Sequence, residues 1–510
     1  MSALPPVFQD TGLRRWQNWH EFRYRVKQLL DVWNGDPQAS SVEGYNATSK
    51  GLQDLIGRAA RDGDRVRAAG GGWSYSSVAA PEKGILLNTR PLNYLFPLSS
   101  QNLHPEYEGS AANLLLAQCG NLIANLNHFL EPRGQSLQTS GASNGQTIVG
   151  AMSTGTHGAA IDVGAVQDYV VALHILVSGD RSVWLERASA PVMQDATAQQ
   201  FGGAEVIRDD DLFEAALVSF GSFGLIHGAL LEVTDLFILQ AFRRNLEEVD
   251  EGFERALDQL DFSGMDMPRP ERPHHFQMLF NPFDEGPSGH YVTTMYKIPQ
   301  RQPDCQPIPF GRTRAGDGAL EVAGVITDIA PALTPQFADF LIKSIYKPYE
   351  KVCGTHGEIF TDTAVRGKSA SSAMGIPLGQ VREALDIVLA AIRAKKVPVL
   401  VAARYVKASR ATLAFTSHGP QTCVLEVDGP RSRGVRSTYR RIWRDLRSSG
   451  IPFTFHWGKM NDLDRDPRHI REMYGSRLDR WLTARRTLLP DPALRRVFAN
   501  DFLEKAEIDD

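Results

Sequence analysis

Two glycine-rich stretches decide the fold: Gly70-Gly71-Gly72-Trp73-Ser74-Tyr75-Ser76 and Gly150-Ala151-Met152-Ser153-Thr154-Gly155-Thr156-His157-Gly158. Glycines let backbone N–H groups approach an anion closely, and the Ser and Thr hydroxyls add further donors. Two such loops from separate strands predict a cradle for a pyrophosphate that needs no cationic residue. Either loop taken alone is explained equally well as a tight turn. Neither is a P-loop, because no Gly-Lys-Ser/Thr follows, and neither has the Gly-x-Gly-x-x-Gly spacing of a dinucleotide fingerprint.

The segments that flank these loops alternate between helix and strand. Leu52, Leu55, Ile56 and Ala59 share one face of a helix over residues 51–60, and residues 66–69 form a short strand that leads into the first loop. The other expected elements are strands at 85–87, 114–117 and 229–234, a helix at 122–130, and a hairpin of 170–177 with 183–185. This alternation predicts a mixed α+β domain.

The sequence pattern changes near residue 245. Residues 262–275 and 298–314 carry many Pro, Gly and charged residues, which predicts long surface loops. Val381, Leu385, Val388 and Ile392 then define an amphipathic helix, and a strand at 399–406 follows it without a glycine loop. The expected domains are an N-terminal arm at 1–39 whose first ten residues are loose, a first domain at 40–243, a second at 244–450 and a returning C-terminal segment at 451–510.

The composition is that of an ordinary globular enzyme. The 510 residues exceed what one hydrophobic core usually serves, and 55 Lys and Arg against 59 Asp and Glu leave a net charge of −4. There is no basic block and no run of about eighteen apolar residues, so neither nucleic acid nor a membrane is an expected partner. The first thirty residues do not have the pattern of a secretory signal, and a cytoplasmic location is expected.

The cysteines and histidines do not have the spacing of a metal site. Cys119, Cys305, Cys353 and Cys423 are far apart in the sequence. They can pair, but buried free thiols in a cytoplasmic enzyme are the favoured interpretation. His274 and His275 lie in a polar stretch without further ligands nearby, so no metal is expected.

Several strings together resemble a known family. The two glycine loops, with residues 66–69 before the first and Gln146-Thr147-Ile148-Val149 before the second, resemble the PCMH-type FAD domain of the vanillyl-alcohol-oxidase superfamily, and within it the aldonolactone oxidase and alditol oxidase group. Trp16-Gln17-Asn18-Trp19, residues 220–228 and His456-Trp457-Gly458-Lys459 match further strings in the family's order. The resemblance is weak over residues 245–395. It implies an α+β fold in which a PCMH-type FAD-binding domain of two α+β subdomains meets a substrate (cap) domain built on an antiparallel sheet flanked by helices.

The resemblance also implies which residues hold FAD. They are Gly70, Gly71, Gly72, Trp73, Ser74, Tyr75, Gly141, Ser153, Thr154, Gly155, Thr156, His157, Gly158, Gly224 and Ile226. Trp73 stands where many members carry a histidine bonded to the flavin, and indole has no nitrogen suited to that bond, so noncovalent FAD is expected. Gly141 falls where glycine is associated with oxidases and alanine with dehydrogenases, and the adjacent Ala142 leaves a shift of one residue open.

Three residues are the candidates for catalysis. Arg404 lies on a strand where the group has Glu-x-Arg, and Ala402 stands where the Glu would be. A cation there stabilises the anionic reduced flavin, and the alternative is a surface ion pair. Lys459 holds the substrate oxygen or favours flavin reduction electrostatically, or else it is a solvated lysine. His456 is a base or, equally well, a core histidine.

Other histidines leave similar alternatives. His157 contacts the FAD phosphates or ring, or only supports its loop. His174 and His227 are expected to be packing residues.

The expected reaction is the oxidation of a CH–OH group of a small organic substrate. A hydride passes to flavin N5, the hydroxyl proton leaves, and the electrons are expected to go to O2, giving hydrogen peroxide. A dehydrogenase that uses a quinone or cytochrome acceptor, and a catalytically degenerate FAD-binding protein, remain the alternatives. The sequence predicts neither the substrate nor the oligomeric state.

Overall fold

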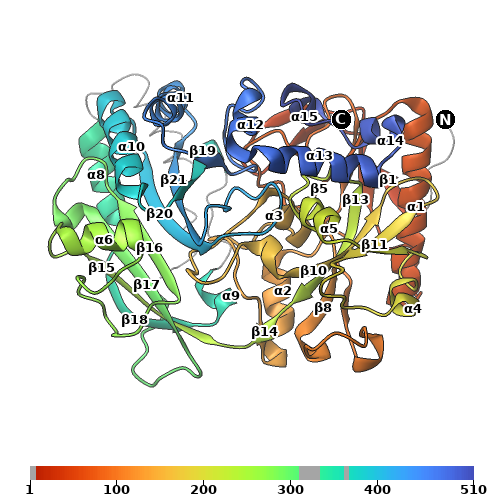
Figure 1. Ribbon diagram of the computed structural model, residues 1–510, viewed down its shortest axis with the longest axis horizontal. Coiled ribbons are helices and arrows are strands. Elements are labelled where there is room, and N and C mark those ends of the chain that lie inside the picture. Colours follow the sequence, from red (N-terminus) through yellow and green to blue (C-terminus); the bar gives the residue numbers. More distant parts are fainter. Residues whose placement is uncertain (1–6, 309–333, 361–366) are drawn as a thin grey trace.

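The computed structural model describes residues 7–308, 334–360 and 367–510. The chain forms two neighbouring lobes, one with a four-stranded and a six-stranded sheet and one built on a single eight-stranded sheet, and the described residues also include two further sheets of two strands each (Figure 1). One apolar core runs through both, and it includes Leu55 of the first lobe, Leu425 of the second and Trp481 near the C-terminus. The predicted α+β class is confirmed.

The first sheet holds the strand that leads into Gly70. Its order is β1-β4-β6-β5, with bounds Phe8–Asp10, Gln28–Val32, Ile85–Asn88 and Val66–Ala69. Helix α1 (Ser41–Asp62) begins at a capping box of Ser40 with Glu43 and ends at Gly63, which is left-handed. The prediction of a loose chain start is wrong from Phe8 on, because β1 pairs with β4 and the Phe8 ring is buried. Residues 1–6 of that start lie outside the described residues.

The second sheet carries the second glycine loop. Its order is β12-β11-β10-β13-β8-β7, with bounds Glu205–Arg208, Ser182–Glu186, Val170–Leu176, Leu225–Glu232, Leu114–Gln118 and Leu95–Pro97. The predicted hairpin is confirmed as β10 with β11, whereas β13 begins already at Leu225. The helices of this region are α2 (Ile123–Leu130), α3 (Ile148–Thr154), α4 (Asp195–Ala198) and α5 (Asp210–Leu217).

The third sheet forms the second lobe and is antiparallel throughout. Its order is β18-β15-β17-β16-β20-β21-β19-β22, with bounds Tyr349–Gly354, Ile238–Asn245, His290–Ile298, His275–Phe280, Leu400–Lys407, Gln421–Pro430, Ser369–Pro377 and Thr454–Phe455. The helices beside it are α6 (Glu251–Gln259), α8 (Thr334–Ile345), α10 (Val381–Lys395) and α11 (Arg433–Ser448). The amphipathic face predicted for α10 is buried, as expected. His275 begins β16 and does not lie in a loop, and residues 309–314 of the second predicted loop lie outside the described residues.

The last part of the chain returns to the first lobe, where α12 to α15 lie in Figure 1. Their bounds are Arg468–Tyr474, Ser476–Leu488, Pro492–Val497 and Asp501–Lys505. The buried Arg485 guanidinium donates to the carbonyl of Ser222 at 3.1 Å, and Asn500 donates to the carbonyl of Val78 at 2.8 Å. These bonds tie the C-terminal segment to the loops of the first lobe.

The cysteines correct one prediction. Cys305 and Cys353 form a disulfide with a Cα–Cα distance of 5.5 Å, although free thiols were the favoured interpretation. The bond forms because Gln306 pairs with Val352 at the edge of the third sheet, which brings two distant segments together. Cys119 and Cys423 are buried free thiols, as expected. A disulfide is unusual in the cytoplasm, where thiols are kept reduced, so it does not support the expected cytoplasmic location. Over the same described ranges, no helix is long and apolar enough to cross a membrane.

Candidate active site

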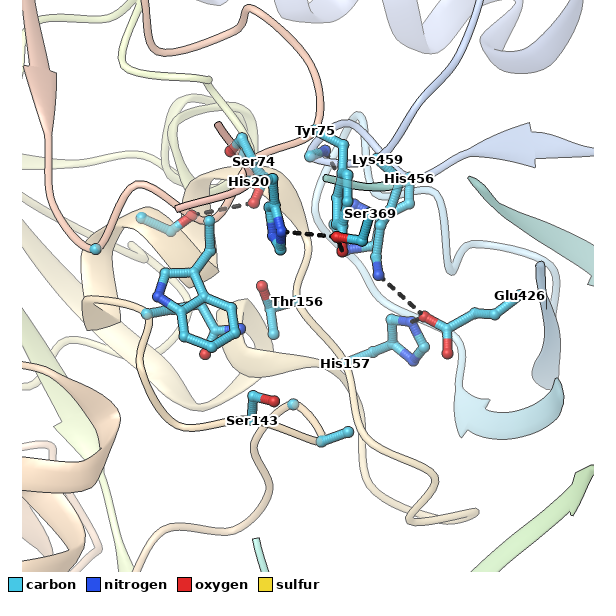
Figure 2. Close-up of a pocket in the computed structure, with 18 of the residues that line it drawn as sticks. His20, Ser74, Tyr75, Ser143, Thr156, His157, Ser369, Glu426, His456 and Lys459 are labelled. Carbon is cyan, nitrogen blue, oxygen red and sulfur yellow. Dashed lines mark hydrogen bonds and ion pairs between the residues drawn. The ribbon is translucent and has the colours of Figure 1, made fainter. Parts of the chain in front are cut away.

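A cavity of about 1010 Å³ lies where the two glycine loops meet the third sheet. Its lining comes from the first loop, the second loop, residues 220–226 and the sheet face that carries Arg404 and Glu426. In Figure 2, the side chains of His157 and Lys459 both approach Glu426. The cavity therefore joins the predicted cofactor loops to the predicted catalytic residues.

The first glycine loop has no room for side chains. A Cβ on Gly70 would overlap the side chain of Thr147, and a Cβ on Gly71 would overlap the carbonyl oxygen of Gly145. Gly72 has a φ of +71°, a conformation that other residues rarely adopt. The backbone of this loop thus lines the cavity directly.

The N-terminal Trp-x-Asn-Trp string braces this loop. The N–H of Trp19 donates to the carbonyl of Gly72 at 2.9 Å, and Asn18 Nδ2 donates to the carbonyl of Ser74 at 2.7 Å. Asn18 Oδ1 in turn accepts from the N–H of Phe22 at 2.9 Å. Two loop carbonyls are therefore engaged by the N-terminal segment and are not available to repel an anion.

The indole of Trp73 is held by packing. It stacks on Trp19 with ring centroids 4.9 Å apart and planes 10° apart. A Cβ on Gly145 would overlap this indole, so the ring fills the space beside the second segment of the cradle. Trp73 lines the cavity without offering a nucleophile.

Residues 150–154 of the second glycine stretch are helical and belong to α3, whose first turn is capped by Thr147 Oγ1, so only residues 155–158 form a loop. The predicted residues of this region that line the cavity are Gly141, Ser153, Thr154, Thr156 and His157. Gly155 and Gly158 do not line it. Gly155 ends α3 with a φ of +80°, and a Cβ on Gly158 would meet the Ser140 carbonyl oxygen at 2.8 Å. Both of these glycines shape the loop.

Residues 220–226 form a third wall, to which Gly224 and Ile226 contribute as predicted. Phe220 and Gly221 both have positive φ values, of 56° and 72°. The buried guanidinium of Arg67 donates to the carbonyls of both residues. This cation fixes an unusual backbone conformation at the cavity wall.

These walls fit a long ligand with a pyrophosphate and a ring system, such as FAD. The glycines at 70 and 71 leave the backbone accessible, and the hydroxyls of Ser74, Ser153, Thr154 and Thr156 belong to residues that line the same cavity. Gln146 also lines the cavity, and its buried Oε1 has no hydrogen-bond partner among the described residues. A buried acceptor without a partner costs roughly 1–3 kcal/mol, and a donor on the ligand would remove that cost.

Four charged side chains converge at the sheet end of the cavity. Arg404 Nη1 lies 2.5 Å from Glu426 Oε2, and Lys459 Nζ lies 3.7 Å from Glu426 Oε1. Lys459 Nζ also donates to Ser371 Oγ at 2.7 Å. Asp428 follows on the same face of β21, because side chains two residues apart in a strand point the same way. The Glu426 side chain is only 4% exposed, so these charges interact with little screening by water.

Burial and neighbouring charges set the ionisation of this group. Burial alone would raise the pKa of Glu426, but the charges of Arg404 and Lys459 outweigh it and lower that pKa to about 2. Burial raises the pKa of Asp428, even though the charge of Lys459 acts in the opposite direction. Burial would lower the pKa of Lys459, but Glu426 and Asp428 raise it above its ordinary value. Glu426 and Lys459 are therefore charged at neutral pH.

Glu426 places a carboxylate directly beside Ala402, where the sequence lacks one. The two residues pair directly across β20 and β21, so both side chains leave the same face of the sheet. Sequence reasoning missed Glu426 because it examined β20 alone. The signal that points to it is the string Leu425-Glu426-Val427-Asp428, in which two acidic residues alternate with apolar ones in a buried strand.

Two histidines face each other beside Glu426, with ring centroids 5.8 Å apart. His157 Nδ1 lies 2.9 Å from the carbonyl of Gly158, to which it donates, and its Nε2 lies 3.8 Å from Glu426 Oε1. Burial lowers the pKa of His157 to about 4 although Glu426 acts against it. His456 Nδ1 accepts from the N–H of Gly458 at 3.0 Å, and burial holds the pKa of His456 well below its ordinary value. Both imidazoles are therefore neutral at neutral pH.

The N-terminal segment adds a histidine that sequence reasoning missed. His20 stacks on Tyr75 with ring centroids 3.8 Å apart, and its Nδ1 lies 3.0 Å from Ser369 Oγ. The Tyr75 hydroxyl lies 3.1 Å from the same oxygen (Figure 2). No spacing reveals this contact, because it joins residue 20 to a strand of the second lobe.

Comparisons with known proteins bear on the cofactor and on the class of reaction. The FAD binding domain family matches residues 46–185, and the D-arabinono-1,4-lactone oxidase family matches residues 279–506. The chain is similar to an L-gulono-1,4-lactone dehydrogenase of Mycobacterium tuberculosis, at 23% identity over 94% of this chain and 99% of that one. It is also similar to the L-gulonolactone oxidase of Bos taurus, at 24% identity over 89% of this chain and 92% of the relative.

The fold is shared with solved structures. Cholesterol oxidase from Brevibacterium sterolicum superimposes with a TM-score of 0.69 at 14% identity, over 98% of this chain and 97% of that chain. The prediction of FAD as the cofactor is confirmed by the family matches.

Proposed function

Because the chain belongs to the PCMH-type FAD superfamily and is an FAD-dependent oxidoreductase that acts on a CH–OH group, we propose that its substrate is a small polyhydroxylated compound of the aldonolactone kind. The relatives are named for gulonolactone and arabinonolactone. Without a carboxylate at position 402, a substrate other than a simple sugar lactone or polyol would be expected, but Glu426 supplies a carboxylate beside Arg404. A sugar-like ring carries several hydroxyls, and a cavity end with Arg404, Glu426, Asp428 and Lys459 offers both donors and acceptors for them.

One observation carries this proposal, namely the convergence of four ionisable side chains at the junction of the second glycine loop and the third sheet, where Glu426 is buried and Arg404, Asp428 and Lys459 are half-buried. Removing charged groups from water is costly even when they are paired, and ionisable groups with shifted pKa values that line a cavity are typical of functional sites.

We expect the two glycine loops and residues 220–226 to hold FAD, through backbone N–H groups and the hydroxyls of Ser74 and Thr156. FAD supplies a two-electron oxidant that accepts a hydride. The indole at Trp73 leaves no group for the usual covalent link, so the binding is noncovalent.

Arg404 and Lys459 provide positive charge at the sheet end of the cavity. Lys459 keeps its proton at neutral pH, so we assign it an electrostatic role and not that of a base. A fixed cation stabilises an oxygen that gains negative charge as its proton leaves. Arg404 is held by Glu426 and by Gln277 Oε1 at 3.0 Å, which keeps its guanidinium in one orientation.

The electron acceptor is O2 in our proposal, because Gly141 lines the cavity at the position where the family resemblance associates glycine with oxidases. A Cβ at this position would meet Thr156 Cγ2 at 2.9 Å. A dehydrogenase with a quinone or cytochrome acceptor remains the second candidate, since one relative is named a dehydrogenase. Reoxidation of the dithionite-reduced protein in air within seconds supports the oxidase, and persistence of the reduced form supports the dehydrogenase.

The substrate is tested by anaerobic mixing of the yellow protein with aldonolactones, polyols, sterols and phenolic alcohols. We expect an aldonolactone or polyol to bleach the flavin absorbance and a sterol to leave it unchanged. Bleaching by dithionite but by none of the polyhydroxylated compounds would contradict the proposed substrate class.

A further inference from the structure

His157 and Glu426 present two proton acceptors to each other. Because Nδ1 of His157 donates to the carbonyl of Gly158, its Nε2 carries the lone pair in the neutral ring. That lone pair lies 3.8 Å from Glu426 Oε1, and both residues are nearly fully buried. Two acceptors this close repel each other unless a donor lies with them.

The surroundings of this pair suit a hydroxyl group as the donor. Both side chains line the cavity (Figure 2), so a ligand can reach them. Lys459 Nζ lies 3.7 Å from the same Glu426 oxygen, which brings a cation near the hydroxyl oxygen while the two acceptors compete for its hydrogen. The separations of 3.7 and 3.8 Å exceed hydrogen-bond length, so neither Lys459 nor His157 bonds directly to Oε1.

We propose that His157 Nε2 is the base that takes the substrate's hydroxyl proton and that Glu426 stabilises the imidazolium formed. This inference rests on the proposed oxidation of a CH–OH group. The O–H bond breaks and its proton goes to Nε2, a second C–O bond forms, and the C–H bond breaks. Its hydrogen leaves as hydride with the electron pair, to the FAD oxidant that this class of reaction uses.

The other titratable groups near His157 are poorer bases than His157. Lys459 and Arg404 are cations and oppose protonation of the ring, whereas Glu426 favours it. Glu426 is committed to Arg404 through its other oxygen, and the two cations hold it in the ionised form. His456 also faces His157, but its Nδ1 accepts a backbone N–H, and no ion-pair contact joins it to a carboxylate in the described part of the chain.

The first test uses His157→Gly and His157→Gln in the FAD-loaded protein. Flavin reduction by the best substrate under anaerobic conditions should slow by roughly a hundredfold to ten-thousandfold, the usual range for a general base. Added imidazole should restore much of the rate to His157→Gly, because it supplies the missing base. His418→Gln is the matched control. His418 is also a histidine whose pKa burial lowers to about 4, but it lies outside the cavity lining.

The second test needs no substrate and uses Glu426→Gln. The imidazole resonance of His157, identified by its loss in His157→Gln, should titrate below its ordinary pKa in the wild type and lower still in Glu426→Gln. Glu426→Asp should lie between the two. This readout reports on the pair even when a variant is inactive or when His157→Gly does not fold.

The two tests separate the role of the base from that of its carboxylate. Reduction at the wild-type rate in His157→Gln with full FAD, or failure of imidazole to rescue folded His157→Gly, would overturn the assignment of His157. If the pKa of His157 is the same in the wild type and in Glu426→Gln, Glu426 does not stabilise the imidazolium. If no CH–OH compound reduces the wild-type flavin, the proposed function fails, and the resonance test still decides whether the pair exists.

Discussion

Lys459→Met removes one charge from the buried group at the end of the cavity and keeps most of the side-chain length. Lys459 Nζ lies 3.7 Å from Glu426 Oε1 and donates to Ser371 Oγ at 2.7 Å. Its side chain is 22% exposed, so the ammonium is largely desolvated but not sealed off. The substitution leaves Glu426 with Arg404 as its remaining partner.

The magnitude follows from the charges. Two unit charges about 4 Å apart interact by about 4 kcal/mol at the effective dielectric of a protein surface. A substrate oxygen that becomes negative near Lys459 would gain only part of this interaction energy, because Glu426 also interacts with the ammonium. A loss of about 2.7 kcal/mol corresponds to roughly a hundredfold slower step. Removing one partner of a buried pair costs about 3–5 kcal/mol of stability, and we expect the lower end because Arg404 still holds Glu426.

The assay is stopped-flow reduction of the flavin by substrate without oxygen, together with the FAD content and the unfolding midpoint. We expect full FAD content, a somewhat lower midpoint and reduction slowed by roughly a hundredfold. Lys297→Met is the matched control, because Lys297 stacks over Phe237 at 4.1 Å and does not line the cavity. Reduction of the Lys459→Met flavin at the wild-type rate would refute the electrostatic role.

Three further predictions concern the cofactor and stability. Because Trp73 offers no nucleophile, acid precipitation should release FAD into the supernatant, and a flavin band that stays with the denatured chain would contradict this. Gly71→Asp should purify with little FAD, because its side chain would overlap the Gly145 carbonyl and repel the phosphates, whereas full FAD content would exclude the first loop from the cradle. Burial lowers the pKa of His174 to about 3 and that of His227 well below its ordinary value, so the unfolded chain binds the extra protons. Stability should therefore be complete above the unfolded pKa of about 6.5 and fall below it, by about 1.4 kcal/mol per pH unit for each histidine. Thermal unfolding between pH 8 and pH 5 tests this, and a flat midpoint would argue against it.

Local sequence patterns predict much of the fold. The helical face over residues 51–60 of α1, the helical face of α10 and the β10–β11 hairpin each depend on neighbouring residues, so periodicity and turn residues predict them, although α1 begins ten residues earlier than predicted, at Ser41. The glycine loops are predictable for the same reason, since the steric demands at Gly70 and Gly71 exclude other side chains.

The contacts that sequence reasoning missed all join distant segments. The Cys305–Cys353 disulfide depends on the edge of the third sheet, and the His20 contact with Ser369 joins the N-terminus to the second lobe. A periodic pattern shows which face a residue takes but not which strand lies beside it. Pairing between strands is fixed by the whole fold, so these contacts appear only once the sheet order is known.

The pairing of Glu426 with Ala402 is another contact between distant segments. Because β20 and β21 pair directly at these positions, a carboxylate on either strand reaches the same site. Directly paired Cβ atoms lie about 4.5–5.5 Å apart, so a carboxylate at 402 or at 426 reaches the same region near Arg404. Both positions together should not be tolerated, since two paired carboxylates repel in a buried site.

Ala402→Glu should therefore lower the unfolding midpoint strongly in the wild type, where Ala402 is 3% exposed and directly opposite Glu426. The same change should cost less in a Glu426→Gln background, because the repulsion is absent while the steric cost remains. A double-mutant cycle on chemical unfolding measures this difference. Equal costs of Ala402→Glu in the two backgrounds would mean that the two side chains do not interact and that the carboxylate at 426 does not stand in for one at 402.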